Sequence, residues 1–301
     1  MSDLNELNSP SRLPIRSTVR LAWQQVSGFK ALAWGGTGFY ILISIGISLV
    51  AGLIFGLLLG AMGLPTDPSA AAQPGFDSAF VMSEAMRTLL NLSISFFTAP
   101  LIVGQIMLAV RHLRQTPETN VYCLFNYFKW RYMWRFFAVN IILFALVFAC
   151  IFLGALVFSA GMLLPQHIAA VGLLLKGLLI LGLIVFCFVL FYLIISLQLS
   201  QLLIADKNFH VNSGILTALR TVRKNFWRII GVFLLCGLIL LPIELALIGI
   251  FFGFAALHLE WLGILICSIS VIILIIWLVP WGLLVNGAVY EYLFGNEPEQ
   301  Q

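Results

Sequence analysis

The segment KNFWRIIGVFLL, residues 224–235, joins a basic, tryptophan-containing stretch directly to a long apolar run. Two other segments have a looser version of the same order: GFKALAWGG at 28–36 and MWRFFAVNII at 133–142. Aromatic and basic residues beside long apolar runs are typical of the boundary between a membrane and water. The three segments therefore predict three places where the chain enters a membrane.

The composition predicts a membrane protein. Of the 301 residues, 61% are hydrophobic and 9% are charged, whereas about 25% are charged in soluble domains. Six apolar runs are long enough to cross a hydrocarbon core, which takes about 20 residues of helix. A helix satisfies its own backbone hydrogen bonds in lipid, so we predict an all-α polytopic protein. The predicted spans are 32–63, 86–111, 136–164, 168–204, 229–256 and 262–290.

The regions outside the spans are short and polar. We expect a disordered tail at 1–14, a single membrane domain at 15–294, a short tail at 295–301, and no signal peptide. The five cysteines lack metal or redox spacing, and no nucleophile–base pair or phosphate-binding loop is evident. We therefore predict no enzymatic activity, no cofactor, no metal and no nucleic-acid partner.

The distribution of positive charge predicts the orientation. All the Lys and Arg residues except Arg87 and Lys176 lie before the first span, between spans 2 and 3, or between spans 4 and 5. Loops enriched in Lys and Arg face the cytoplasm, so both termini are predicted to be cytoplasmic. The same residues suit anionic lipid headgroups as partners. The predicted headgroup-facing residues are Lys30, Arg131, Arg135, Arg220, Arg223, Lys224 and Arg228.

A shared order of parts predicts three tandem repeats, at about 15–115, 117–208 and 210–294. In each, a cytoplasmic interfacial amphipathic helix of about 12 to 16 residues precedes two spans, so the copies are parallel. The expected helix caps are Ser17–Thr18, Thr119–Asn120 and Asn212–Ser213, and the expected helix ends are Phe29–Lys30, Trp134–Arg135 and Trp227–Arg228. The alternative is that any polytopic protein carries such residues at its inner boundary.

The third interfacial segment has the clearest pattern. Ile215, Leu219, Val222 and Phe226 form one apolar stripe, and the basic residues lie largely off it. Such a helix lies in the interface with its stripe toward acyl chains or the bundle and its basic face toward headgroups. In the first segment the corresponding stripe is Val19, either Ala22 or Trp23, and Val26.

Three segments carry a family resemblance: GILTALRTVRKNFWRIIGVFLL at 214–235, TAPLIVGQIMLAVRHLR at 98–114 and PWGLLVNGAVYEYLF at 280–294. With them the chain resembles a group of bacterial six-helix inner-membrane proteins. The group includes the YciC-like proteins and the membrane domain fused to some glycerophosphodiester phosphodiesterases. The resemblance implies a six-helix fold in the bacterial inner membrane and a role in envelope or lipid homeostasis. It brings no catalytic residues.

Small and polar residues inside the spans predict specific contacts. Ser44, Ser48, Gly52, Gly56 and Gly60 recur every four residues, which favours close helix packing, either within the chain or in a homo-oligomer. A polar stripe on span 2 either lines a cavity or makes interhelical hydrogen bonds; it consists of Asn91, Ser95, Thr98 and Gln105.

Lys176 and Glu244 are lone charges within apolar runs, at similar depth. They form an ion pair or serve transport, unless Lys176 extends its ammonium outward to water.

The main functional hypothesis is therefore a non-enzymatic inner-membrane protein in envelope or lipid homeostasis that contacts lipids of the cytoplasmic leaflet. One alternative is a transporter of small molecules, lipids or ions, with its path along the polar stripe and Lys176–Glu244. The other is a scaffold or assembly factor that binds a protein partner through the small residues of span 1.

Overall fold

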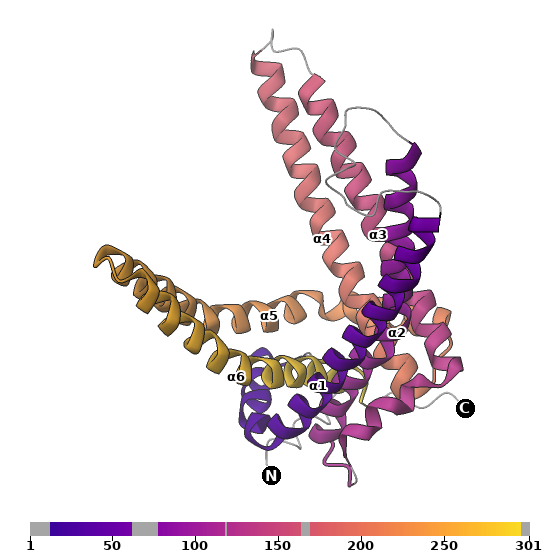
Figure 1. Cartoon of the computed structure of the whole chain (residues 1–301), viewed down its shortest axis with the longest axis vertical. Helices are drawn as coiled ribbons and strands as arrows, with labels where there is room; N and C mark the ends of the chain where they lie inside the picture. The colour runs from indigo at the N-terminus through magenta and orange to yellow at the C-terminus, as the bar shows by residue number, and fades with distance from the viewer. Residues whose placement is uncertain (1–12, 62–77, 118, 164–168, 296–301) are drawn as a thin grey trace. The chain divides into compact units, whose positions relative to one another are not determined.

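The computed structural model describes residues 13–61, 78–117, 119–163 and 169–295, and this part of the chain is helical, with no strand. Six α-helices in it are long and apolar enough to cross a membrane, and the described chain is of the predicted all-α class. The elements, shown in Figure 1, are α1 (Ile15–Ala61), α2 (Ser78–Leu113), the 3₁₀ helix η2 (Val121–Phe128), α3 (Trp130–Leu163), α4 (Ala169–Lys207), α5 (Val211–Ala256) and α6 (Glu260–Phe294).

The segments predicted to be separate interfacial helices are not separate. Helices α1 and α5 run without a break through Lys30 and Arg228, so the prediction that a short helix ends at each of these residues is wrong. No proline removes a backbone donor there, so the helical ladder continues into the apolar run. In the second predicted repeat, η2 ends at Phe128, the following residue Lys129 has an extended backbone, and Trp134–Arg135 lies inside α3.

One of the predicted helix caps is confirmed. Asn120 caps η2, because its Oδ1 accepts a hydrogen bond from the backbone N–H of Cys123 at 3.2 Å. The hydroxyls of Thr18 and Ser213 instead lie within the first turns of α1 and α5 and donate to the carbonyls of Pro14 (2.7 Å) and His210 (3.0 Å). The cap predictions at Ser17–Thr18 and at Ser213 are therefore wrong, since these side chains donate where a cap must accept.

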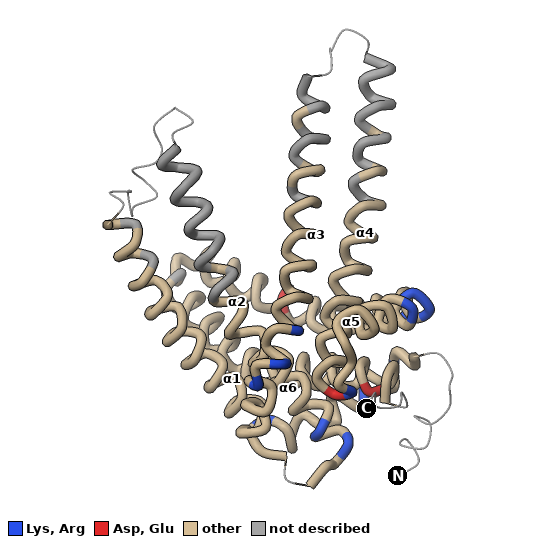
Figure 2. The backbone as a smooth tube through the Cα atoms, turned by 90° about the vertical axis from the view of Figure 1, so that its right-hand side faces the viewer, with Lys and Arg blue, Asp and Glu red and all other residues tan. Residues whose placement is uncertain are grey.

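Among the side chains that the structure describes, the buried ones occupy only part of each long helix. In α2, α4 and α6 they concentrate at 98–110, 195–205 and 280–294. Elsewhere large apolar side chains are exposed, such as Leu49 and Leu57 on α1 and Phe148 on α3. On the parts of α3 and α4 that lead to their connection, the residues drawn tan in Figure 2 are neither acidic nor basic; Lys176 of α4 lies in this part, and its side chain is outside the described residues. Exposed apolar side chains are typical of helices that cross a hydrocarbon core.

The chain forms two units, which do not follow the predicted repeats. The first unit comprises residues 1–20, 138–246 and 289–301, and the second comprises 21–137 and 247–288. In the first unit, α4 contacts α3 and α5 and the end of α6. Gln201 Nε2 donates to Asn140 Oδ1 at 2.6 Å, and the Tyr290 hydroxyl donates to Asp206 Oδ2 at 2.9 Å. The threefold repetition itself stays a prediction.

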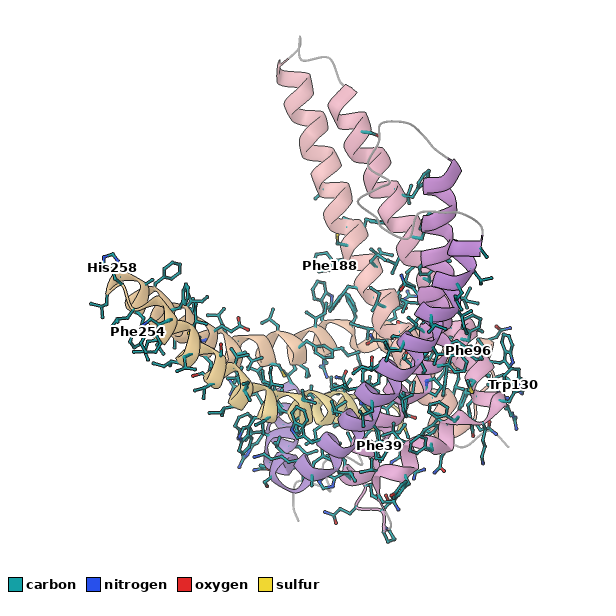
Figure 3. All side chains as sticks on the ribbon, in the orientation of Figure 1. Phe39, Phe96, Trp130, Phe188, Phe254 and His258 are labelled. Carbon is teal, nitrogen blue, oxygen red and sulfur yellow. The ribbon has the colours of Figure 1, made fainter. Side chains whose placement is uncertain are left out.

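In the second unit, α2 contacts α1, η2, α3 and α6. Close approach to η2 and α6 depends on glycine: a Cβ on Gly104 would lie 3.1 Å from Leu124 Cγ, and a Cβ on Gly287 would lie 3.1 Å from the Cβ of Ala109. Small residues let helix backbones approach where lipid supplies no hydrophobic drive for helix association. Phe96 of α2 and Trp130 of α3 lie together, with ring centroids 6.2 Å apart (Figure 3).

Candidate functional site

The first half of α5 separates basic from buried residues on opposite faces. Gly214, Ala218, Val222 and Ile229 are buried. The opposite face carries four exposed side chains, Arg220, Arg223, Lys224 and Trp227, at positions i, i+3, i+4 and i+7 of the helix. We call these four residues the α5 basic face. Arg228, the remaining predicted residue of this segment, is half-buried.

The α5 basic face is open to a ligand. Trp227 is 72% exposed, and its ring lies 6.1 Å from that of Phe188 on α4. No carboxylate in the described part of the chain forms an ion pair with Arg220, Arg223 or Lys224. Three cations held on one helix face without counter-charges attract anions, and the exposed indole suits a membrane–water boundary.

The buried face of α5 is rotated from the predicted apolar stripe. Val222 is buried as predicted, but Ile215, Leu219 and Phe226 are only half-buried. The centre of the face passes through Gly214, whose position allows close contact with α4: a Cβ there would lie 3.3 Å from Ile204 Cγ1 and 3.7 Å from the Ser200 carbonyl oxygen. Apolar periodicity does not reveal this contact, because glycine carries no hydrophobic signal.

A second basic and aromatic group lies at the start of α3. Arg131, Trp130 and Trp134 are exposed, and Arg135 is half-buried. The Trp134 and Phe96 ring centroids lie 5.4 Å apart, so the aromatic residues attach this end of α3 to α2. Of the two predicted headgroup residues here, Arg131 is the more accessible.

A third group, which we call the Trp–Lys cluster, joins α1 to α6. It consists of Trp23, Lys30, Trp34, Trp277 and Trp281. The Lys30 ammonium lies 3.0 Å from the centroid of the Trp277 ring, a cation–π contact. Trp23 stacks on Trp277 with centroids 6.0 Å apart and meets Trp281 edge-on at 5.6 Å. Of the two alternatives for the apolar stripe of the first segment, Ala22 is the buried residue, whereas Trp23 is 51% exposed.

A proline explains one hydrogen bond of the Trp–Lys cluster. Pro280 has no backbone N–H, so the carbonyl of Ile276, four residues earlier in α6, lacks its helical donor. Trp34 Nε1 donates to this carbonyl at 3.1 Å. The indole of α1 thus satisfies the backbone group that proline leaves open, and it links the two helices at this point.

The other indole in the cluster has no such partner. Trp281 is 3% exposed, and its Nε1 is buried without a hydrogen-bond partner in the described structure. A buried tryptophan N–H usually finds an acceptor.

The polar stripe of α2 divides into two parts. Thr98 is buried and donates to the carbonyl of Ile94 at 3.0 Å, and Gln105 Nε2 donates to the carbonyl of Gly36 on α1 at 3.3 Å. Thr98 is therefore engaged in a hydrogen bond within α2, and Gln105 in one between helices, which is the alternative to lining a cavity. Ser95 is half-buried, and Asn91 is exposed.

The remaining predicted residues have no contacts that define a site. Glu244 is exposed on α5; Lys176 belongs to α4, but its side chain lies outside the described residues, so their pairing stays a prediction. Along α1, Ser44 and Gly56 are half-buried, whereas Ser48, Gly52 and Gly60 are exposed. No described atom lies within 4 Å of a Cβ built on Gly52, Gly56 or Gly60, so the predicted packing role of this stripe has no partner in the described part.

Sequence reasoning missed a polar seam in the first unit. Ser196 and Ser200 are fully buried on α4 and donate to backbone carbonyls, and Gln201 reaches Asn140 of α3. Tyr192 of the same helix donates to the carbonyl of Leu219 at 2.9 Å. The signal was available in the run YLIISLQLSQ, 192–201, where polar residues interrupt an apolar segment.

Comparisons with models of protein families, with curated proteins and with solved structures found no match.

Proposed function

We propose that the protein is a non-enzymatic multi-pass protein of the bacterial inner membrane that binds anionic lipid headgroups of the cytoplasmic leaflet through the α5 basic face. Through this binding it acts in lipid or envelope homeostasis. The observation that supports the proposal is the segregation on α5, where Arg220, Arg223 and Lys224 are exposed opposite a buried face. The buried face holds the helix against α4, so the cations have a constant direction.

The magnitude of the interaction is sufficient for selective lipid enrichment. A basic residue near an anionic leaflet contributes about 1 kcal/mol, so three contribute about 3 kcal/mol. The interaction is between exposed charges, so salt weakens it. Trp227 adds an indole whose apolar ring and N–H suit the headgroup level.

The test is to count phosphatidylglycerol molecules that remain with the full-length protein after extraction in a neutral detergent, at low and at high salt. We expect the Arg220→Gln, Arg223→Gln, Lys224→Gln variant to retain fewer of the salt-sensitive lipid molecules. Cells that carry this variant should show the same envelope defect as cells that lack the protein.

The matched control keeps the charge. In the Arg220→Lys, Arg223→Lys variant the face remains cationic, so lipid retention should stay at the wild-type level. The proposal fails if the glutamine variant retains as much phosphatidylglycerol as the wild type and supports normal envelope growth.

A further inference from the structure

The Trp–Lys cluster contains hydrogen-bond donors that the described residues do not satisfy. A lysine ammonium has three N–H donors and no acceptor, and the contact observed for Lys30 is the ring of Trp277, with no carboxylate paired to it in the described ranges. The buried N–H of Trp281, one turn from Trp277 on α6, also lacks a partner. The aromatic cluster therefore holds a positive charge without a counter-ion and a neutral N–H without an acceptor among the described residues.

The positions of the tryptophans place this cluster at a membrane boundary. Four of the eight tryptophans of the chain belong to it. On α6, Trp261 and Trp281 are separated by twenty residues, which is about 30 Å of helix, the thickness of a hydrocarbon core. Tryptophans mark both boundaries of membrane-spanning segments. Lys30 and Trp281 therefore lie at the level where phospholipid phosphates begin.

We infer that the Trp–Lys cluster is a binding site for the phosphate ester of one phospholipid, separate from the α5 basic face. A phosphate supplies the negative counter-charge that is missing beside the Lys30 ammonium. It presents oxygens in several directions, so one phosphate can accept hydrogen bonds from both Lys30 and Trp281. Trp23 and Trp277, which are partly exposed, provide apolar surface for the adjoining glycerol carbons. Trp34, held by the Ile276 carbonyl, keeps α1 and α6 together beneath the site.

The two lipid sites differ in their response to salt. The α5 basic face consists of exposed charges, which salt screens. In the Trp–Lys cluster Lys30 is half-buried and Trp281 is buried. Salt therefore screens the attraction between the bound phosphate and Lys30 less strongly. One lipid should therefore remain bound at a salt concentration that removes those held by α5, and its retention should not depend on Arg220, Arg223 or Lys224.

The experiment titrates the delipidated full-length protein, in a neutral detergent, with phosphatidylglycerol and counts bound lipids by native mass spectrometry at low and high ammonium acetate. We expect one phosphatidylglycerol to persist at high salt. Lys30→Met should weaken it at least about tenfold, and Trp281→Phe, which keeps the ring and removes the N–H, about fivefold. Trp261→Phe, at the opposite boundary, and the α5 glutamine variant should leave it unchanged.

Competition identifies the source of the phosphate. Glycerol 3-phosphate and inorganic phosphate should fail to displace the lipid at equal concentration; if either displaces it, the site takes a soluble phosphate and the lipid assignment is overturned. The inference is also overturned if Lys30→Met leaves the salt-resistant lipid in place. Lys30→Arg, which keeps the charge, should retain the lipid, and this result separates binding from folding if Trp281→Phe does not yield folded protein.

Discussion

At the scale of single residues, Pro280 and Trp34 show how a local defect in one helix becomes a contact with another. A proline in a helix interior leaves the carbonyl four residues earlier without a donor. Lipid offers no water to satisfy that carbonyl, so the donor must come from the protein. Trp34 supplies it at 3.1 Å from the carbonyl oxygen of Ile276.

Removing the indole donor should destabilise the protein. Trp34→Phe leaves the Ile276 carbonyl unpaired, and we expect a loss of about 1 to 3 kcal/mol in unfolding free energy. In a Pro280→Ala background the restored backbone N–H can pair with that carbonyl, so the same substitution should cost less. Thermal unfolding of the four proteins of this cycle in detergent measures the difference. Equal losses in the two backgrounds would show that the hydrogen bond contributes nothing beyond ring packing.

At the scale of elements, glycines decide how closely the helices approach. On α6, Gly287 lies against α2, where an added Cβ would be 3.1 Å from the Ala109 Cβ and 3.2 Å from the Val110 nitrogen. Gly282, on the same helix, has no described atom within 4 Å of its added Cβ. Both glycines lie in a helical backbone, but only Gly287 is closely packed. Comparing substitutions at the two positions therefore separates the effect of packing from that of helix propensity.

Alanine at these two positions should have opposite effects. Gly287→Ala forces α2 and α6 apart and should destabilise the fold by about 1 to 3 kcal/mol. Gly282→Ala should be neutral or stabilise it by up to about 1 kcal/mol, because alanine favours the helix. Thermal unfolding of each variant in the same detergent is the measurement. Similar destabilisation by both substitutions would contradict the close α2–α6 contact.

At the scale of the whole molecule, the six helices that can span a membrane combine with a one-sided distribution of Lys and Arg. An even number of crossings returns the chain to the side on which it began. The basic loops predict that this side is the cytoplasm. This orientation is the condition under which the α5 basic face meets the anionic leaflet.

Reporter fusions test the orientation. Green fluorescent protein joined to either terminus should fluoresce, because it folds in the cytoplasm, and alkaline phosphatase joined to either terminus should be inactive. Alkaline phosphatase joined in the connection between α1 and α2 serves as the control and should be active. Phosphatase activity at either chain end would reverse the orientation and place the α5 basic face on the opposite leaflet.

The predicted boundaries failed for a physical reason. At Lys30 and Arg228 the chemistry changes from basic to apolar, and the sequence shows this change clearly. A change of solvent does not by itself break the backbone hydrogen bonds of a helix, so α1 and α5 continue through it. Asn120 was predicted correctly as a cap, because its amide oxygen accepts from the start of η2 and Lys129 then ends that helix in an extended conformation.

Residue composition alone was enough to predict the helical class and six helices long and apolar enough to cross a membrane, because hydropathy acts on each segment regardless of its neighbours. Which face of each helix is buried became known from the packing of the helices. In an almost uniformly apolar helix every face has the same affinity for lipid, so shape selects the contact. Gly214 against Ile204, Gly287 against Ala109 and Trp34 against the carbonyl of Ile276 are contacts of shape and hydrogen bonding, for which a hydrophobic pattern carries no signal.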